Sequence, residues 1–170
     1  MKQHVVVLLD ISYSMLTQTR SIVDGVNKFV KSLTQRQDSY NILFTLILFS
    51  HEFTYMCKGI FVNEVPTFTI EDLPTFGQTH LYDAIAKVLN DWILEKRANH
   101  HLFIITDGMD NGSKLLGEEE AKKACEIAID DHGWKITHCD VNLYSLTSSK
   151  VQKVIYNVNN LENLLENLKI

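Results

Sequence analysis

Turn-forming residues and long apolar runs are both scarce. The 170 residues include two prolines and seven glycines, which leaves little room for linkers or low-complexity tracts. No apolar stretch approaches the roughly 20 residues that a membrane-spanning helix needs. We therefore expect no membrane partner and one domain over residues 1–170, because this length can bury a substantial core.

Cysteines are few as well. Cys57, Cys125 and Cys139 are odd in number and lack the paired spacing of a zinc site. Their apolar neighbours predict buried free thiols in a reducing compartment. The first apolar run starts at Val5 and meets Asp10 too early for the core of a signal peptide, so the prediction is a cytoplasmic protein.

There is no excess of basic residues. The sequence has 16 Lys and Arg residues and 21 Asp and Glu residues, which gives a formal net charge of −5. Without surplus positive charge to neutralise phosphates, we expect no nucleic-acid partner. The hydrophobic fraction of 45% and the charged fraction of 22% are typical of a globular domain.

One buried strand ends in an acid and two hydroxyls. Residues 5–9 are five consecutive apolar residues, typical of a strand buried on both faces. Asp10, Ser12 and Ser14 follow at every second position, which points their side chains to one side of an extended segment. Three such oxygens suit a hard cation such as Mg²⁺. The alternative is that they cap the next helix.

Strands and helices alternate along the rest of the chain. Two residues separate the apolar runs 41–50 and 53–60, so these form a hairpin and the second is an antiparallel edge strand. Residues 154–158 fit a strand or a helix, and we predict the strand. Leucines at helical spacing predict a final helix over 161–168. Further strands are expected over 101–108 and 134–139, and helices over 17–33, 79–92 with Thr79 as N-cap, and 118–131.

This order predicts an α/β fold with a doubly wound, mainly parallel central sheet, one antiparallel edge strand and helices on both faces. Such sheets bind ligands beyond the carboxyl ends of the strands, where the strand order reverses. The strands that end in Asp10 and Asp107 are expected to be neighbours at that point. Their two carboxylates would then share a crevice.

Three segments together resemble a von Willebrand factor type A (VWA) domain. They are Asp-Ile-Ser-Tyr-Ser at 10–14, Gly-Gln-Thr-His-Leu-Tyr-Asp-Ala-Ile at 77–85 and Thr-Asp-Gly at 106–108. They occur in the family's order, each at a strand end or a helix start, and the resemblance covers essentially the whole chain. It implies a Rossmann-like VWA fold.

The resemblance also implies a metal-ion-dependent adhesion site, abbreviated MIDAS. In that arrangement Ser12, Ser14 and Thr79 would ligate Mg²⁺, or Mn²⁺, through their hydroxyls. Asp10 and Asp107 would hold the ion mainly through bound waters. Neutral hydroxyl ligands leave the charge of the cation largely uncompensated. An acidic residue of a partner protein would complete the coordination.

Four further residues lie beside these candidates. Tyr13 stands where the family commonly has glycine, so the loop must take an ordinary conformation and places an aromatic ring at the rim. Asp140 follows the 134–139 strand, and its charge would weaken recruitment of an acidic ligand. His80 and Asp110 are candidates to contact the ligand or support the metal site. The alternative for these two is an exposed loop histidine and a turn aspartate.

The predicted function is a metal-dependent protein-binding module without catalytic turnover. A metal-assisted hydrolase or phosphoryl-transfer enzyme is the alternative, because a cation can activate water. Against it, the sequence has no G-x-S-x-G elbow and no P-loop lysine. A phosphatase with Asp10 as nucleophile would want a second acid at position 12, which is serine. A third possibility is a structural metal clamp within an assembly.

Overall fold

The computed structural model describes residues 1–140 and 148–155. In this range the strands form one sheet in the order β3-β2-β1-β4-β5-β6. Every neighbouring pair is parallel except β2 and β3, so the predicted doubly wound sheet with one antiparallel edge strand is confirmed. The strands are β1 (Lys2–Asp10), β2 (Ile42–Phe49), β3 (Phe53–Phe61), β4 (Ala98–Thr106), β5 (Lys135–Asp140) and β6 (Gln152–Ile155).

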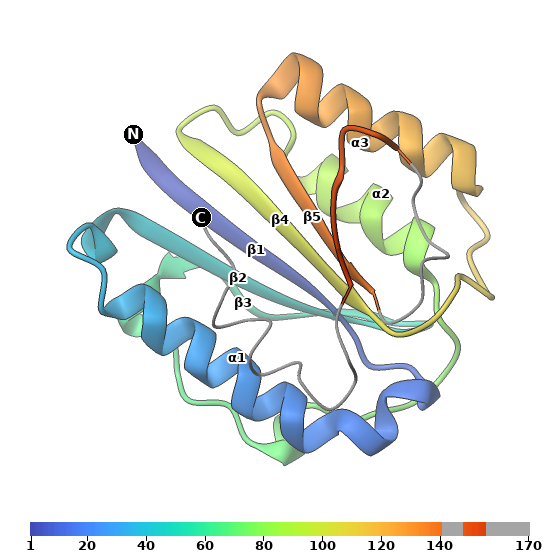
Figure 1. The fold of residues 1–170 in the computed structure, drawn as a ribbon, viewed down its shortest axis with the longest axis horizontal. Coiled ribbons are helices and arrows are strands. Elements are labelled where there is room, and N and C mark those ends of the chain that lie inside the picture. Colours follow the sequence, from blue (N-terminus) through green and yellow to red (C-terminus); the bar gives the residue numbers. More distant parts are fainter. Residues whose placement is uncertain (141–147, 156–170) are drawn as a thin grey trace.

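Helices cover both faces of the sheet (Figure 1). The helix α1 (Thr19–Thr34) lies on one face, and α2 (Leu81–Trp92) and α3 (Glu118–His132) lie on the other. Each helix buries apolar positions against the sheet, as amphipathic spacing dictates. None of the described helices is long and apolar enough to cross a membrane.

The first strand lies between the two hydrophobic cores. Val5, Val7 and Leu9 belong to the core on the α1 face, and Val6 and Leu8 belong to the core under α2 and α3. Successive strand side chains point to opposite faces, so a continuous apolar run supplies both cores. The prediction of a strand buried on both faces is confirmed.

Several element boundaries differ from the prediction. Residues Tyr13–Gln18 form a 3₁₀ segment, so α1 begins two residues later than expected. The strand β4 begins at Ala98, three residues early. Val154 and Ile155 lie in β6, so the strand prediction holds for the described part of 154–158. The predicted helix over 161–168 lies outside the described residues.

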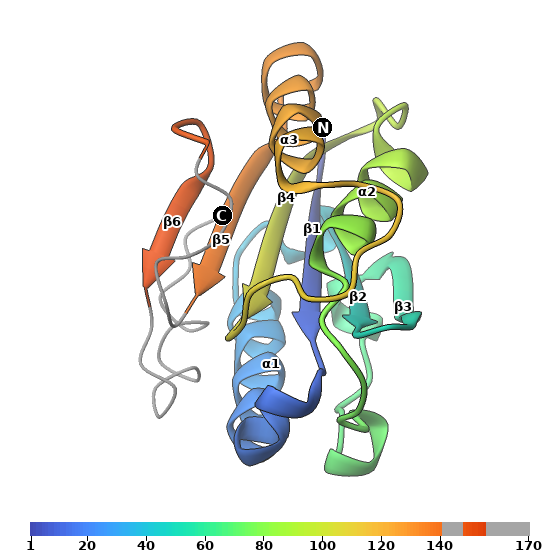
Figure 2. The same cartoon turned by 90° about the vertical axis from the view of Figure 1, so that its right-hand side faces the viewer.

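The carboxyl ends of the parallel strands meet at one edge of the sheet (Figure 2). The strand order reverses between β1 and β4, which pair directly, with Leu9 opposite Ile105. Asp10 and Thr106 are the next residues along the two strands. The sequence prediction that these strands are neighbours at the reversal point is therefore confirmed.

Two buried imidazoles form a hydrogen-bonded chain near the opposite edge. His100 Nε2 lies 2.9 Å from the carbonyl oxygen of Glu95, His100 Nδ1 lies 3.0 Å from His4 Nδ1, and His4 Nε2 lies 2.8 Å from Thr45 Oγ1. A carbonyl only accepts, so His100 Nε2 donates and His100 Nδ1 accepts from His4. His4 Nε2 then accepts from the Thr45 hydroxyl. Because the two facing Nδ1 atoms share one proton, the two rings cannot both be protonated.

Buried histidines predict a loss of stability in mild acid. Burial lowers the pKa of His4 from its ordinary value of 6.5 to about 3 and the pKa of His101 to about 4. The unfolded chain therefore takes up protons near pH 6.5, whereas the folded chain does so only near pH 4 and below. The free energy of unfolding should fall from pH 7 to pH 5, by about 1 kcal/mol per pH unit for each such histidine.

Urea unfolding at pH 7, 6 and 5 measures this slope. His101→Gln removes one of the groups, and should flatten the slope by about 1 kcal/mol per pH unit. A slope identical in His101→Gln and the wild type would contradict the assignment.

Candidate metal centre

Four oxygens from three distant segments form a continuous chain at the carboxyl edge of the sheet. Thr79 Oγ1 donates to Ser12 Oγ at 2.9 Å, and Ser12 Oγ lies 3.2 Å from Ser14 Oγ. Ser14 Oγ in turn donates to Asp107 Oδ1 at 2.6 Å. The structure thus brings together four of the five residues that the sequence analysis named as metal ligands.

The fifth, Asp10, lies beneath this chain and is fully buried. Its Oδ1 accepts the backbone N–H of Ser12 at 2.8 Å, and its Oδ2 accepts the hydroxyl of Thr106 at 2.6 Å. Burial raises the pKa of the Asp10 carboxyl, and these hydrogen bonds oppose the rise. Asp10 thus fixes the start of the loop that carries Ser12 and Ser14, called the serine loop below, and its carboxylate also interacts with the Ser12 side chain.

The helix-capping interpretation of the hydroxyls is wrong. Ser12 stands at the N-cap position of the 3₁₀ segment but makes no capping hydrogen bond with its side chain. Thr79 is not the N-cap of α2, because that helix begins at Leu81 and His80 occupies the cap position. Both hydroxyls are engaged with each other instead. Only the contact from Asp10 to the Ser12 backbone resembles a cap.

A residue missing from the sequence analysis, Gln18, holds the second oxygen of Asp107. Gln18 Nε2 donates to Asp107 Oδ2 at 2.9 Å, whereas Ser14 donates to Oδ1, so each carboxylate oxygen accepts its own hydrogen bond. Burial raises the pKa of Asp107, with these bonds opposing the rise. Gln18 carries no sequence signal, since the predicted helix from residue 17 placed it inside regular helix.

A second missing residue, Asn111, binds the backbone of Thr79 on both sides. The Thr79 N–H donates to Asn111 Oδ1 at 2.9 Å, and the Asn111 N–H donates to the Thr79 carbonyl at 3.0 Å. Nearby, Asp83 on α2 accepts the backbone N–H groups of residues 114–116. The loop after β4 is thereby fastened to the start of α2.

His80 and Asp110 lie in the packing between these two loops. Asp110 Oδ1 accepts the backbone N–H of Tyr82 at 3.3 Å, and the Asp110 carboxylate also bonds Ser113. The His80 ring lies against Gly112, where a Cβ would come within 2.3 Å of the imidazole. His80 also donates its backbone N–H to the Ser50 carbonyl at 3.1 Å and lies beside the His51 ring, so it contacts the β2–β3 hairpin as well.

Three exposed apolar residues stand within two positions of a candidate ligand in the sequence. Tyr13 opens the 3₁₀ segment, in an ordinary conformation, and is 68% exposed. Leu16 and Met109, each two residues from a candidate ligand, are 60% and 59% exposed. The position of the Tyr13 ring at the rim of the site stays a prediction.

Asp140 adds a third carboxylate to this edge of the sheet. It ends β5, pairs in register with Thr106 and is buried. Its negative charge contributes to the raised pKa of Asp107. The two carboxylates are therefore close enough to interact.

The donor set fits a hard divalent ion. Cis ligands of an octahedron with metal–oxygen distances of about 2.1 Å lie about 3.0 Å apart. The two links between hydroxyls, 2.9 and 3.2 Å, are close to this spacing. Gly108 lies next to these hydroxyls, because a Cβ there would be at the ordinary contact distances of 3.8 Å from Ser14 Oγ and 3.9 Å from Thr79 Oγ1.

The same set disfavours softer metals. It holds hydroxyls and carboxylates and no sulfur or imidazole, which suits Mg²⁺ or Mn²⁺ better than zinc. Within residues 1–140 and 148–155, no three His, Cys, Asp or Glu side chains gather as a metal-binding group. The three cysteines are free thiols, with Cys125 and Cys139 buried and Cys57 half-buried.

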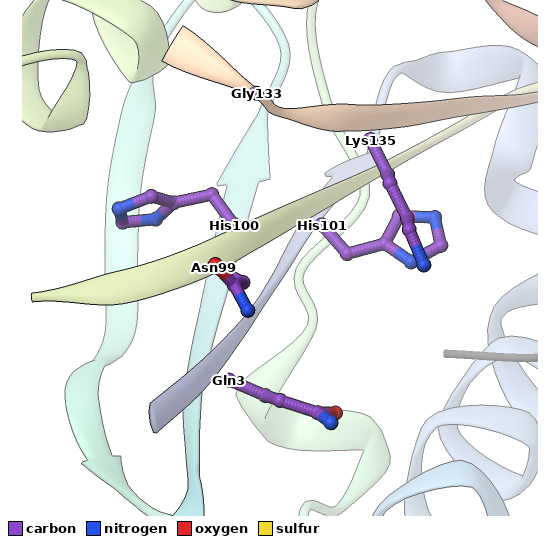
Figure 3. A pocket seen from close by; sticks show the side chains of 6 residues that line it. All are labelled: Gln3, Asn99, His100, His101, Gly133 and Lys135. Carbon is purple, nitrogen blue, oxygen red and sulfur yellow. The ribbon is translucent and has the colours of Figure 1, made fainter. Parts of the chain in front are cut away.

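A separate hollow of about 160 Å³ lies at the amino ends of β1, β4 and β5 (Figure 3). Gln3, His101 and Lys135 extend to one side of the sheet there, while His100 extends to the other. Gln3 Oε1 and His101 Nδ1 are buried without a hydrogen-bond partner. This hollow shares no residue with the oxygen chain.

The family model for the von Willebrand factor type A domain matches residues 4–169. The chain belongs to the VWA family. VWA domains commonly serve as protein-interaction modules, and most are not enzymes. A comparison with curated proteins gave no significant match.

Solved structures share the fold at low identity. The pilus adhesin SpaC from Lactobacillus rhamnosus GG superimposes with a TM-score of 0.72 and 14% identity, over 98% of this VWA domain and 29% of SpaC. A von Willebrand factor type A protein from Catenulispora acidiphila gives 0.69 and 13%, over 97% and 41%. The mussel byssus protein PTMP1 with a zinc-occupied MIDAS motif gives 0.64 and 13%, over 97% and 46%. The chain spans less than half of each.

The contact between Thr106 and Asp10 should stabilise this VWA domain even without metal. Thr106→Val keeps the shape of the side chain but leaves Asp10 Oδ2 without that donor. We expect a loss of about 1–3 kcal/mol in the free energy of unfolding, measured by urea titration in EDTA. Thr54→Val, the same change at an exposed position of β3, should stay within about 0.5 kcal/mol of the wild type. Equal effects of the two substitutions would contradict this.

Proposed function

We propose that this VWA domain is a divalent-metal-dependent protein-binding module. Its MIDAS would hold Mg²⁺, with Mn²⁺ as a substitute, and an acidic residue of a partner protein would complete the coordination. The observation that carries the proposal is the gathering of three hydroxyls beside the carboxylate of Asp107, with the hydroxyl links of 2.9 and 3.2 Å close to the spacing of cis octahedral ligands. The PTMP1 structure with a zinc-occupied MIDAS motif supports the idea that this fold accommodates such an ion.

Each candidate residue has a distinct role in this proposal. Ser12, Ser14 and Thr79 ligate the ion through their hydroxyls, and Asp107 and Asp10 hold it mainly through water. When bound, the ion supplies a concentrated positive charge with an open coordination position. Because three of the ligands are neutral, much of that charge remains available to an incoming carboxylate.

The surroundings of the site favour a protein as the partner. Tyr13, Leu16 and Met109 are large exposed apolar residues within two positions of a candidate ligand in the sequence. Aromatic residues and methionine are enriched at the cores of protein interfaces. A partner segment with an acidic side chain and apolar neighbours matches this surface. The charge of Asp140 weakens the attraction for that acid, so the domain relies on the apolar contacts as well.

Catalysis has less support. In the described part of the chain, the hydroxyls of Ser12, Ser14 and Thr79 bond one another and Asp107, and none is paired with an imidazole that could serve as a general base. Both oxygens of Asp10 already accept hydrogen bonds. A binding role therefore fits the geometry better than a hydrolase or a phosphoryl-transfer enzyme.

Metal binding is tested by isothermal titration of Mg²⁺ into protein stripped with EDTA. The wild type should give heat that saturates at one ion per chain. Thr79→Val and Asp107→Asn each remove one oxygen function while keeping the side-chain shape, and both should weaken Mg²⁺ binding at least tenfold. Thr54→Val is the matched control and should bind as the wild type does. Absence of binding in the wild type would refute the proposal.

The open coordination position is tested with Mn²⁺-loaded protein. Acetate should displace a Mn²⁺-bound water and lower the water-proton relaxivity, whereas its neutral isostere acetamide should not. If the domain binds Mn²⁺ but acetate has no effect, the metal is a structural clamp instead. Turnover in a phosphatase or esterase panel that is lost in Asp107→Asn would favour the enzyme.

A further inference from the structure

Asn111 is the only described residue that bonds the backbone of Thr79 on both sides. Its side-chain oxygen accepts the Thr79 N–H at 2.9 Å, and its own N–H donates to the Thr79 carbonyl at 3.0 Å. The two residues are 32 positions apart and come from different loops. Together these bonds fix the position and the direction of the Thr79 peptide units.

Thr79 needs such support because regular structure does not hold it. The helix α2 begins two residues later, at Leu81, and His80 between them is not helical. The Thr79 side chain is nonetheless buried and reaches Ser12, 67 residues away. The Thr79 hydroxyl can stay 2.9 Å from the Ser12 hydroxyl, which lies on another loop, only if the Thr79 backbone is fixed.

The same loop carries Asp107, four residues before Asn111. Between the loops, a Cβ on Gly112 would lie within 2.3 Å of the His80 ring and 3.3 Å from Gln78 Oε1, so the Gly112 backbone packs closely against these two side chains. The hydroxyl and the carboxylate at the two ends of the oxygen chain are therefore joined through Asn111. Any shift of this loop moves both ends together.

We propose that Asn111 is a positioning residue of the metal centre, which holds the Thr79 hydroxyl at ligand distance from the site that Asp107 closes. This inference rests on the proposed function. Asn111 does not touch the ion; it acts through the backbone of a ligand. Partners that orient metal ligands typically change metal affinity 10- to 100-fold when they are removed.

The first arm of the test needs no metal. Amide hydrogen exchange in EDTA should show a protected Thr79 N–H in the wild type. Asn111→Ala should lose that protection, and Asn111→Asp, which keeps the acceptor oxygen, should retain it. Equal Thr79 exchange in the wild type and Asn111→Ala overturns the inference.

The second arm measures Mn²⁺ affinity by electron paramagnetic resonance. Asn111→Ala should bind Mn²⁺ about tenfold more weakly. Asn90→Ala, the same change at an exposed position of α2, should bind as the wild type does. Urea unfolding in EDTA accompanies both variants, because a merely structural residue would lower stability without changing the affinity.

The outcomes separate the inference from the proposed function. Wild-type affinity in Asn111→Ala, with Mn²⁺ bound by both proteins, overturns the positioning role alone. A wild type that binds no Mn²⁺ overturns the proposed function and the positioning role together.

Discussion

The hydrogen bond from Thr106 to the buried carboxylate of Asp10 is the contact on which the rest of the site depends. It joins the last residues of β1 and β4, the two strands between which the sheet reverses its order. The other oxygen of Asp10 holds the backbone of Ser12 and so sets where the serine loop begins. Burying a carboxylate without hydrogen-bond donors costs free energy of folding. The strand ends and the serine loop are therefore held in the geometry that supplies both donors to Asp10.

From that fixed point, three loops contribute oxygens that no single segment could assemble. The serine loop and the loop after β4 meet where Ser14 bonds Asp107, and Thr79 joins from the start of α2. Two amides outside the oxygen chain, Gln18 and Asn111, orient its ends. The arrangement gathers three neutral hydroxyls and the carboxylate of Asp107, with Asp140 at the same edge of the sheet.

The fold and two acidic candidates, Asp10 and Asp107, could be predicted because their signals are local, whereas Thr79 is named as a ligand only through the resemblance to the VWA family. The apolar run 5–9 predicts a strand buried on both faces, and the two-residue link between 41–50 and 53–60 permits only a hairpin. Asp10 and Asp107 follow from the rule that ligands bind where parallel strands end at the reversal of strand order. Spacing and position suffice for these features.

The supporting contacts could not be predicted in this way. Gln18 and Asp107 are 89 residues apart in the sequence, and Asn111 and Thr79 are 32 residues apart. Neither hydrogen bond therefore produces a periodic pattern in the sequence. Threonine is a common N-cap residue, but the Thr79 hydroxyl donates a hydrogen bond to Ser12 and does not cap α2. In each case a contact between distant loops prevailed over the local preference.

The central claim is that a single divalent ion binds among the hydroxyls of Ser12, Ser14 and Thr79. An anomalous difference map at the manganese edge, from crystals grown with Mn²⁺, tests it most directly. The account predicts one strong peak within about 2.5 Å of all three hydroxyl oxygens. A map without a peak at that position, from crystals in which Mn²⁺ reaches the solvent beside the site, would contradict it.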